Sequence, residues 1–95
     1  MKKFIISIDQ GTTSSRAILF DLKGKPVFSS QKEFTQYFPN SGWVEHDPEE
    51  IWSTTKKVLK DVIEKAKRIK GKVLTIGITN QRETTVLWDI KTGKP

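Results

Sequence analysis

The chain has 95 residues, a net charge of +6, no cysteine and a single histidine, His46. This length allows one small domain with a limited core. The missing thiols exclude a disulfide framework and a thiolate metal site, and one histidine is too few for a zinc site built on imidazoles.

The first residues do not have the pattern of a signal peptide. The apolar run that follows Lys3 is short, Asp9 interrupts it, and no small-residue cleavage site comes after it. No segment has the roughly 20 apolar residues that a helix needs to cross a bilayer. We therefore expect a cytoplasmic protein without a membrane partner.

The positive charge leaves one alternative function open. Lysines are spread along the sequence, with a denser group between Lys56 and Lys72. A small basic module that binds nucleic acid needs positive charge clustered on one face, whereas lysine is usually found on the solvated surface. We expect no nucleic-acid partner, and salt-sensitive binding to RNA or DNA would favour the alternative.

Three strands are predicted in the first third of the chain. The run at 4–8 is apolar and rich in β-branched residues, which is typical of a strand covered on both faces. Glycine and hydroxyl residues mark the connections, and Pro26 is tolerated because it opens the third strand. In chain order we predict a strand at 4–8, a turn at 9–13, a strand at 14–20, a hairpin turn at 21–25 and a strand at 26–34.

A loop at 39–42 precedes a long amphipathic helix. Asp47 is expected to cap this helix, with Pro48 at its first position and Glu50 completing a capping box. Cations in the last turn complement the helix dipole, and Gly71 is expected to end the helix. The apolar residues that fall on one helical face are Ile51, Trp52, Val58, Leu59, Val62, Ile63, Ala66 and Ile69.

Two more strands are predicted after the helix. Residues 73–78 are apolar enough to be buried, 80–83 form a polar connection, and 84–88 form the last strand. Residues 89–95 resemble a hairpin turn that opens toward a strand outside this chain. The order strand, strand, strand, helix, strand, strand predicts an α/β fold with a mixed sheet and a helix on one face.

The tryptophans and the histidine are interpreted as structural residues. Trp52 lies on the apolar helix face and Trp88 in the last predicted strand, so both are expected in the core. Trp43 is expected to pack locally within its loop. His46 has no acidic partner at the spacing of a catalytic triad, so it is expected to be a loop residue.

A turn rich in hydroxyl groups follows the first predicted strand. Gly11 allows a ligand to approach the backbone, and residues 12–14 offer N–H and hydroxyl donors of the kind that bind phosphate. Arg16 projects from the same strand face as Ser14 and matches phosphate oxygens in geometry. Asp9 suits a magnesium ion beside phosphates, although an Asx-type turn in which Asp9 bonds its own backbone explains the same residues.

Three segments resemble motifs of one enzyme family. Residues 9–16 (DQGTTSSR) resemble the first phosphate motif of the FGGY carbohydrate kinases, and residues 42–48 (GWVEHDP) the segment before that family's first long helix. Residues 77–85 (GITNQRETT) look like a third motif in its glycerol-phosphorylating branch. The resemblance implies the actin-like, ribonuclease H-like ATPase fold, with residues 1–95 as the N-terminal portion of the first domain. The remainder of that domain and the whole second domain are then expected outside this chain.

The resemblance also implies an activity, the transfer of phosphate from ATP to glycerol that yields ADP and sn-glycerol 3-phosphate. ATP and Mg²⁺ are the implied cofactors, glycerol the implied substrate, and a homo-oligomer the implied assembly. No catalytic residue is expected in this chain, because the family's base is an aspartate that would lie beyond Pro95. By resemblance, Thr12, Thr13, Ser14 and Arg16 bind the nucleotide, Arg82, Glu83 and Thr12 bind the substrate or product, and Asp9 lies near the metal, held through water.

The third motif admits other interpretations. From the residues alone, Arg82 and Glu83 also suit an ordinary surface ion pair, whereas arginine donors and glutamate acceptors can orient the vicinal hydroxyls of a polyol. An actin-like module that binds ATP without a polyol is a further alternative, which glycerol binding would exclude. Another sugar kinase of the FGGY family also stays open.

Overall fold

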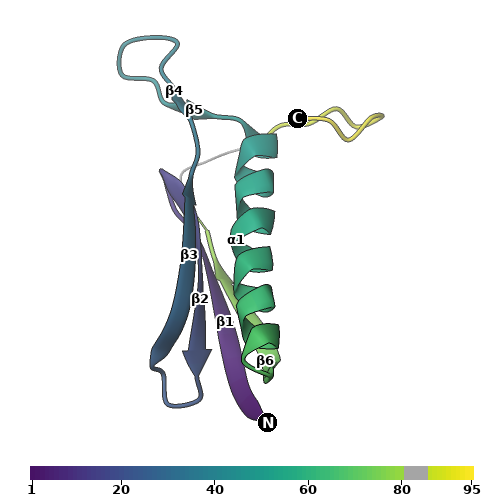
Figure 1. Cartoon of the computed structure of the whole chain (residues 1–95). Helices are drawn as coiled ribbons and strands as arrows, with labels where there is room; N and C mark the ends of the chain where they lie inside the picture. The colour runs from purple at the N-terminus through teal and green to yellow at the C-terminus, as the bar shows by residue number, and fades with distance from the viewer. Residues whose placement is uncertain (81–85) are drawn as a thin grey trace.

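A computed structural model describes residues 1–80 and 86–95 of the chain. A long helix lies across one face of a four-stranded sheet, and a small two-stranded ribbon projects beyond the sheet (Figure 1). The elements are β1 (Lys2–Gln10), β2 (Ser14–Asp21), β3 (Pro26–Glu33), β4 (Gln36–Tyr37), β5 (Glu45–His46), α1 (Pro48–Arg68) and β6 (Gly71–Thr79).

The sheet is mixed, as the predicted order of elements requires. β1 pairs antiparallel with β2, β2 pairs antiparallel with β3, and β6 lies parallel to β1 after the crossover through α1. The order of strands in the sheet is β3-β2-β1-β6. The carboxyl ends of β1 and β6 and the first turn of α1 therefore meet at one end of the molecule (Figure 1).

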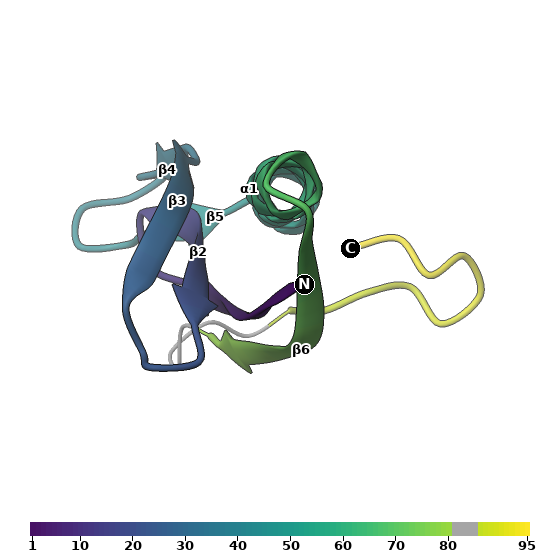
Figure 2. The same cartoon turned by 60° about the horizontal axis from the view of Figure 1, so that its bottom comes forward.

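The core lies between α1 and one face of the sheet, as Figure 2 shows. Every second residue of β1 and β2 is buried there, because successive strand side chains point to opposite faces. The opposite face carries no helix among residues 1–80 and 86–95, so the expected cover on both faces of the first strand is not seen. The buried apolar residues of the core are Phe4, Ile6, Ile8, Ala17, Leu19, Val58, Val62 and Ala66.

The start of α1 confirms the predicted cap but not the predicted capping box. The side chain of Asp47 accepts a hydrogen bond of 3.0 Å from the N–H of Glu49, and Pro48 occupies the first helical position. Glu50 does not turn back to the cap. Its Oε1 accepts the N–H of Thr35 at 2.6 Å instead, so this carboxylate joins the helix to the segment after β3.

The buried face of α1 is narrower than the sequence predicts. Its buried residues are spaced by four positions, namely Thr54, Val58, Val62 and Ala66. Trp52 points away from this stripe and is 56% exposed, so its expected core position is wrong. Its ring instead lies under the ammonium group of Lys56, 5.3 Å from Nζ to the ring centroid.

The helix ends before the glycine that was expected to end it. Ile69 is the C-cap, and Lys70 adopts the left-handed conformation with φ of 56°. Gly71 is already the first residue of β6. A Cβ at this position would stand 2.1 Å from Cε2 of Phe4, so the glycine is needed for close packing against β1.

The chain after the helix is more exposed than predicted. Leu74, Ile76 and Ile78 of β6 are exposed. β6 is an edge strand, and α1 does not cover its second half, which contains Ile76 and Ile78. The prediction of a last strand at 84–88 is wrong for its described residues, 86–88. Residues 86–88 form no strand, Trp88 is exposed, and residues 84 and 85 lie outside the described part of the chain. The predicted turn is present, since Gly93 donates its N–H to the carbonyl of Asp89.

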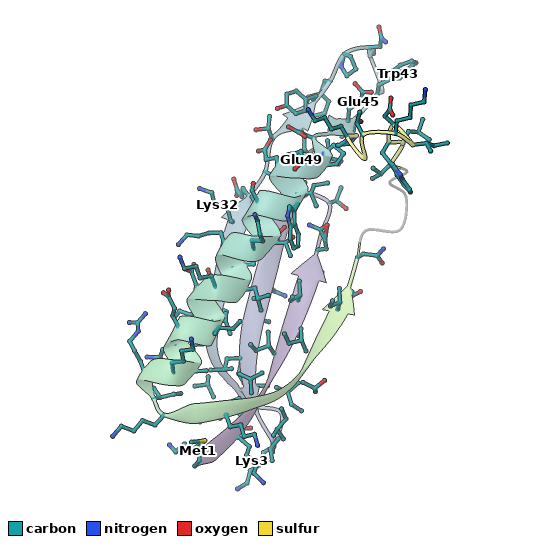
Figure 3. The ribbon with its side chains drawn as sticks, turned by 90° about the vertical axis from the view of Figure 1, so that its right-hand side faces the viewer. Met1, Lys3, Lys32, Trp43, Glu45 and Glu49 are labelled. Atoms are coloured by element: carbon teal, nitrogen blue, oxygen red, sulfur yellow. The ribbon has the colours of Figure 1, made fainter. Side chains whose placement is uncertain are left out.

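The predicted loop at 39–42 is present, and the two short strands β4 and β5 lie on either side of it. The turn between β4 and β5 contains Trp43, whose side chain is 58% exposed. Figure 3 shows Trp43 and Glu45 beyond the first turn of α1. His46 lies in β5 rather than in a loop, with its ring edge-on to Phe34 at a centroid distance of 5.2 Å.

No helix of the described residues is long and apolar enough to span a membrane.

Candidate phosphate-binding turn

The turn between β1 and β2 presents free donors at its tip. It is closed by the N–H of Gly11, which donates to the carbonyl of Ser14 at 2.9 Å. The N–H of Phe34 donates to the carbonyl of Thr13 at 3.1 Å, so the turn is also tied to the segment after β3. Thr12 and Thr13 are exposed, and their N–H groups bond to no acceptor within residues 1–80 and 86–95. Free N–H and hydroxyl groups on a tight turn are suitable for binding an anion.

Three predicted site residues lie together on the sheet face that points away from α1. Asp9 and Arg16 are paired residues of β1 and β2, and Ser14 lies two positions before Arg16 on the same face. The distance from Arg16 Nη2 to Asp9 Oδ2 is 3.8 Å, and both side chains are about half exposed. Ser14 Oγ accepts a hydrogen bond of 2.8 Å from Gln31 Nε2 of β3. An exposed ion pair of this kind adds little stability, so both charged groups are available to a ligand.

Asp9 fits a magnesium ion that shares its coordination with phosphates. Magnesium is commonly held by one or two carboxylates together with waters and phosphate oxygens. Asp9 supplies one half-exposed carboxylate at the end of β1. The described residues contain no group of three or more histidine, aspartate or glutamate side chains that could enclose a metal ion. One carboxylate that can act together with waters and phosphate oxygens is a donor set that suits magnesium.

The described part of the third motif leads to the same place. Thr79, the last residue of β6, pairs with Asp9 of β1 in the parallel ladder. Arg82 and Glu83 follow in the sequence by three and four residues. These two predicted substrate residues lie outside the described part of the chain.

A group of polar side chains on the other face of the turn was missed by the sequence analysis. Gln10 and Ser15, which flank the turn, bond to Thr54 and Thr55 of α1. We call these four residues the hydroxyl cluster. A signal for it exists in the sequence, because two adjacent threonines interrupt the apolar face of the helix between Ile51 and Val58.

Comparison with known proteins gives one family. The model of the N-terminal domain of the FGGY family of carbohydrate kinases matches residues 4–95. Over all 95 residues the chain is 62% identical to a glycerol kinase of Alkaliphilus metalliredigens and 59% identical to one of Petrotoga mobilis. These alignments cover 100% of this chain and 19% of each relative, so the chain spans about a fifth of the length of the curated relatives it matches.

Solved structures agree with the sequence comparison. A crystal structure of Plasmodium falciparum glycerol kinase with ADP matches with a TM-score of 0.85 and 39% identity, over 99% of this chain and 19% of that one. A xylulose kinase from Rhodospirillum rubrum matches with a TM-score of 0.84 and 31% identity, over 93% of this chain and 18% of that one.

Proposed function

The chain belongs to the FGGY family of carbohydrate kinases, and from this premise we propose that the protein carrying it is an ATP-dependent glycerol kinase. The observation that carries this proposal is the 59–62% identity to glycerol kinases over the whole chain. The fold is that of FGGY kinases, an α/β fold of the actin-like ATPase type. We propose that residues 1–95 form the N-terminal portion of the first of two domains.

The sugar kinases of the same family are the nearest alternative. Xylulose and gluconate kinases match this structure with TM-scores of 0.74 to 0.84, so the backbone alone does not distinguish the substrates. Sequence identity to those structures is only 23–32%. The much higher identity to glycerol kinases favours glycerol, and the family match also favours a kinase over a basic module that binds nucleic acid.

In the proposed reaction, the bond between the γ-phosphorus of ATP and its bridging oxygen breaks, and a bond forms to a terminal oxygen of glycerol. The hydroxyl proton passes to a base, which we expect beyond Pro95. ADP leaves with the bridging oxygen, and the product is sn-glycerol 3-phosphate. Since little covalent chemistry is required of the protein in such transfers, positioning and charge carry most of the catalysis.

The turn supplies donors for the nucleotide phosphates. The free N–H groups and hydroxyls of Thr12 and Thr13 would bind phosphate oxygens, together with Ser14 Oγ. Arg16, half exposed on the same edge, would add a charged donor. Thr12 at the tip would also touch the phosphorylated product. A magnesium ion would neutralise charge on the phosphates, and Asp9 would hold it through its water shell.

We further propose that Arg82 and Glu83 hold glycerol beside this turn, and that the enzyme is a cytoplasmic homo-oligomer. The pairing of Asp9 with Thr79 supports the placement of the third motif next to the phosphate turn. A guanidinium donates in a fixed geometry and a carboxylate accepts, so together they can orient the adjacent hydroxyls of a small polyol.

A steady-state assay of the complete protein tests the substrate assignment. The Arg82→Ala variant should raise the KM for glycerol about tenfold or more, the expected effect of losing hydrogen bonds from a charged group, and should change the KM for ATP much less. Arg68→Ala is the matched control, because it removes the same group from the end of α1. An unchanged glycerol dependence in Arg82→Ala would remove Arg82 from the substrate site. Faster phosphorylation of xylulose or gluconate than of glycerol by the wild type would overturn the choice of substrate.

A further inference from the structure

The hydroxyl cluster is a buried polar connection between the turn and the helix. Ser15 is 0% exposed and Thr54 is 5% exposed. Ser15 Oγ lies 2.9 Å from Thr54 Oγ1 and 3.2 Å from Thr55 Oγ1. Gln10 Nε2 lies 2.8 Å from Ser15 Oγ and 3.3 Å from Thr55 Oγ1. Buried polar groups weaken a core unless their hydrogen bonds are made. Apolar packing alone would therefore not require hydroxyl groups at these positions.

A single arrangement of hydrogens uses every donor of the hydroxyl cluster. Both threonines donate their hydroxyl hydrogens to the carbonyl of Ile51, at 2.9 Å from Thr54 and 2.8 Å from Thr55. Ser15 can then donate to Thr54, and the two amide hydrogens of Gln10 reach Ser15 and Thr55. Thr54, at 2.9 Å, is the shorter of the two contacts open to the Ser15 hydroxyl, and Thr55 lies at 3.2 Å. A satisfied network of this kind holds its members in one geometry.

The hydroxyl cluster and the side chains proposed to bind phosphate lie on opposite faces of the same strands. Ser15 points to α1, whereas its neighbours Ser14 and Arg16 point to the other face of the sheet. Gln10 and Ser15 are the last paired residues of β1 and β2 and therefore stand at the two ends of the turn. Fixing both of them to α1 fixes the backbone from which the turn projects.

Apolar side chains could join the same elements without this directional constraint. One turn further along α1, Val58 fills the equivalent position against the sheet and belongs to the apolar core. The change from apolar to hydroxyl side chains occurs only at the end of the helix that lies beside the turn. The position of the polar contacts thus follows the position of the candidate site.

We propose that the hydroxyl cluster positions the phosphate-binding turn, with Ser15 and Thr54 as positioning residues that do not touch the nucleotide. This inference rests on the proposed function of the turn. Small displacements of groups that bind a reacting phosphate reduce the rate strongly. Hydrogen bonds from the turn to α1 hold the donors of the turn in the position that the nucleotide phosphates require.

The test compares variants of the complete protein in kinetics, ADP binding and thermal unfolding. Ser15→Ala and Thr54→Val remove a hydroxyl from the hydroxyl cluster, and Thr54→Val keeps the shape of the side chain. Thr54→Ser restores the hydroxyl. Ser53→Ala is the matched control, because its hydroxyl bonds only to the carbonyl of Glu50 on the exposed side of α1. ADP affinity is measured by titration calorimetry.

We expect Ser15→Ala and Thr54→Val each to raise the KM for ATP and weaken ADP binding by about tenfold, the order of one buried hydrogen bond. The KM for glycerol should change less than about twofold, because the polyol does not bind through the hydroxyl cluster. Thr54→Ser and Ser53→Ala should remain within about twofold of the wild type in all constants. Should Ser15→Ala fail to fold, Thr54→Val and Thr54→Ser carry the test.

Equal changes in both KM values, or a lower melting temperature with unchanged ADP affinity, would overturn the positioning role. The two proposals fail separately. A wild type that binds ADP but transfers no phosphate to glycerol contradicts the proposed function, while a selective loss of ADP affinity in Thr54→Val still supports the positioning role. A wild type that binds no ADP contradicts both.

Discussion

Gly71 shows how one residue sets the distance between two elements. A Cβ built there would stand 2.1 Å from Cε2 and 2.5 Å from Cδ2 of Phe4, whose ring is only 2% exposed and has little room to move. We expect Gly71→Ala to lower the free energy of unfolding by about 1–3 kcal/mol through overpacking. Thermal unfolding of the protein measures the effect.

The control for this substitution lies in the same strand. A Cβ at Gly77 would meet no atom within 4 Å among the described residues. Gly77→Ala should leave the stability unchanged or raise it by up to about 1 kcal/mol, because alanine loses less backbone entropy on folding. Equal destabilisation by the two substitutions would show that the close contact with Phe4 is not the cause.

For single residues, the sequence could predict contacts within one element but not contacts between distant segments. The cap formed by Asp47 and the shared face of Ser14 and Arg16 depend on spacing within one element, and both are present. The capping box fails because Glu50 finds a partner 15 positions away, at Thr35. A competing contact between distant segments cannot be read from local spacing.

The contact between α1 and β3 gives the fold a dependence on pH. Asp61 accepts hydrogen bonds from Lys57 Nζ at 2.8 Å and from Ser30 Oγ at 2.7 Å. These two bonds, that of Lys57 first, hold the pKa of the Asp61 carboxyl below its ordinary value. The same bond raises the pKa of Lys57. The stabilising ion pair is therefore present at pH values above the pKa of Asp61 and below the pKa of Lys57.

The sign of the effect follows from the direction of these pKa changes. Because the folded-state pKa of Asp61 is lower than that of the unfolded chain, its contribution to stability is full above the unfolded-state pKa of about 3.9. It is lost as the pH falls through the lower folded-state pKa. The contribution of Lys57 is full below its unfolded-state pKa and is lost as the pH rises through the higher folded-state pKa.

We expect Asp61→Asn to be less stable than the wild type at neutral pH, with a difference that shrinks as the pH falls below about 4. Denaturant unfolding at a series of pH values measures this difference. Glu45→Gln is the control, because it removes an exposed carboxylate that affects the pKa of neither Asp61 nor Lys57. A stability difference for Asp61→Asn that persists undiminished at low pH would contradict the explanation.

Helices and strands that carry their own start and stop signals could be predicted from the sequence. Features that depend on contacts with other elements could not. The first hairpins and α1 follow from turn residues and periodicity, and both are present. The short ribbon of β4 and β5 has only two residues in each strand, too few for a pattern. The apolar run of β6 predicts burial, but its actual exposure depends on how much of the strand α1 covers, and the second half of β6 turns away from the helix.

At the scale of the whole molecule, the arrangement of elements brings the candidate site to one edge. Parallel β1 and β6 end beside each other, and the first turn of α1 is at the same end (Figure 1). The sequence could predict this turn, and spacing within one strand could predict that Ser14 and Arg16 share a face. The two threonines in the helix face are visible in the sequence, but their partner is not, because Ser15 and Thr54 are 39 positions apart and meet only in the folded chain.

The most direct test of the account is ADP formation from ATP and Mg²⁺ by the complete protein, with and without glycerol, in Arg16→Ala and Lys32→Ala. Both substitutions remove a cation near the turn, but Lys32 pairs with Ser15 and is thus on the opposite face from Arg16. We predict glycerol-dependent ADP formation in the wild type and in Lys32→Ala, and a rise in the KM for ATP of about tenfold or more in Arg16→Ala. ADP formation that does not depend on glycerol, or equal kinetics in the two variants, would contradict the account.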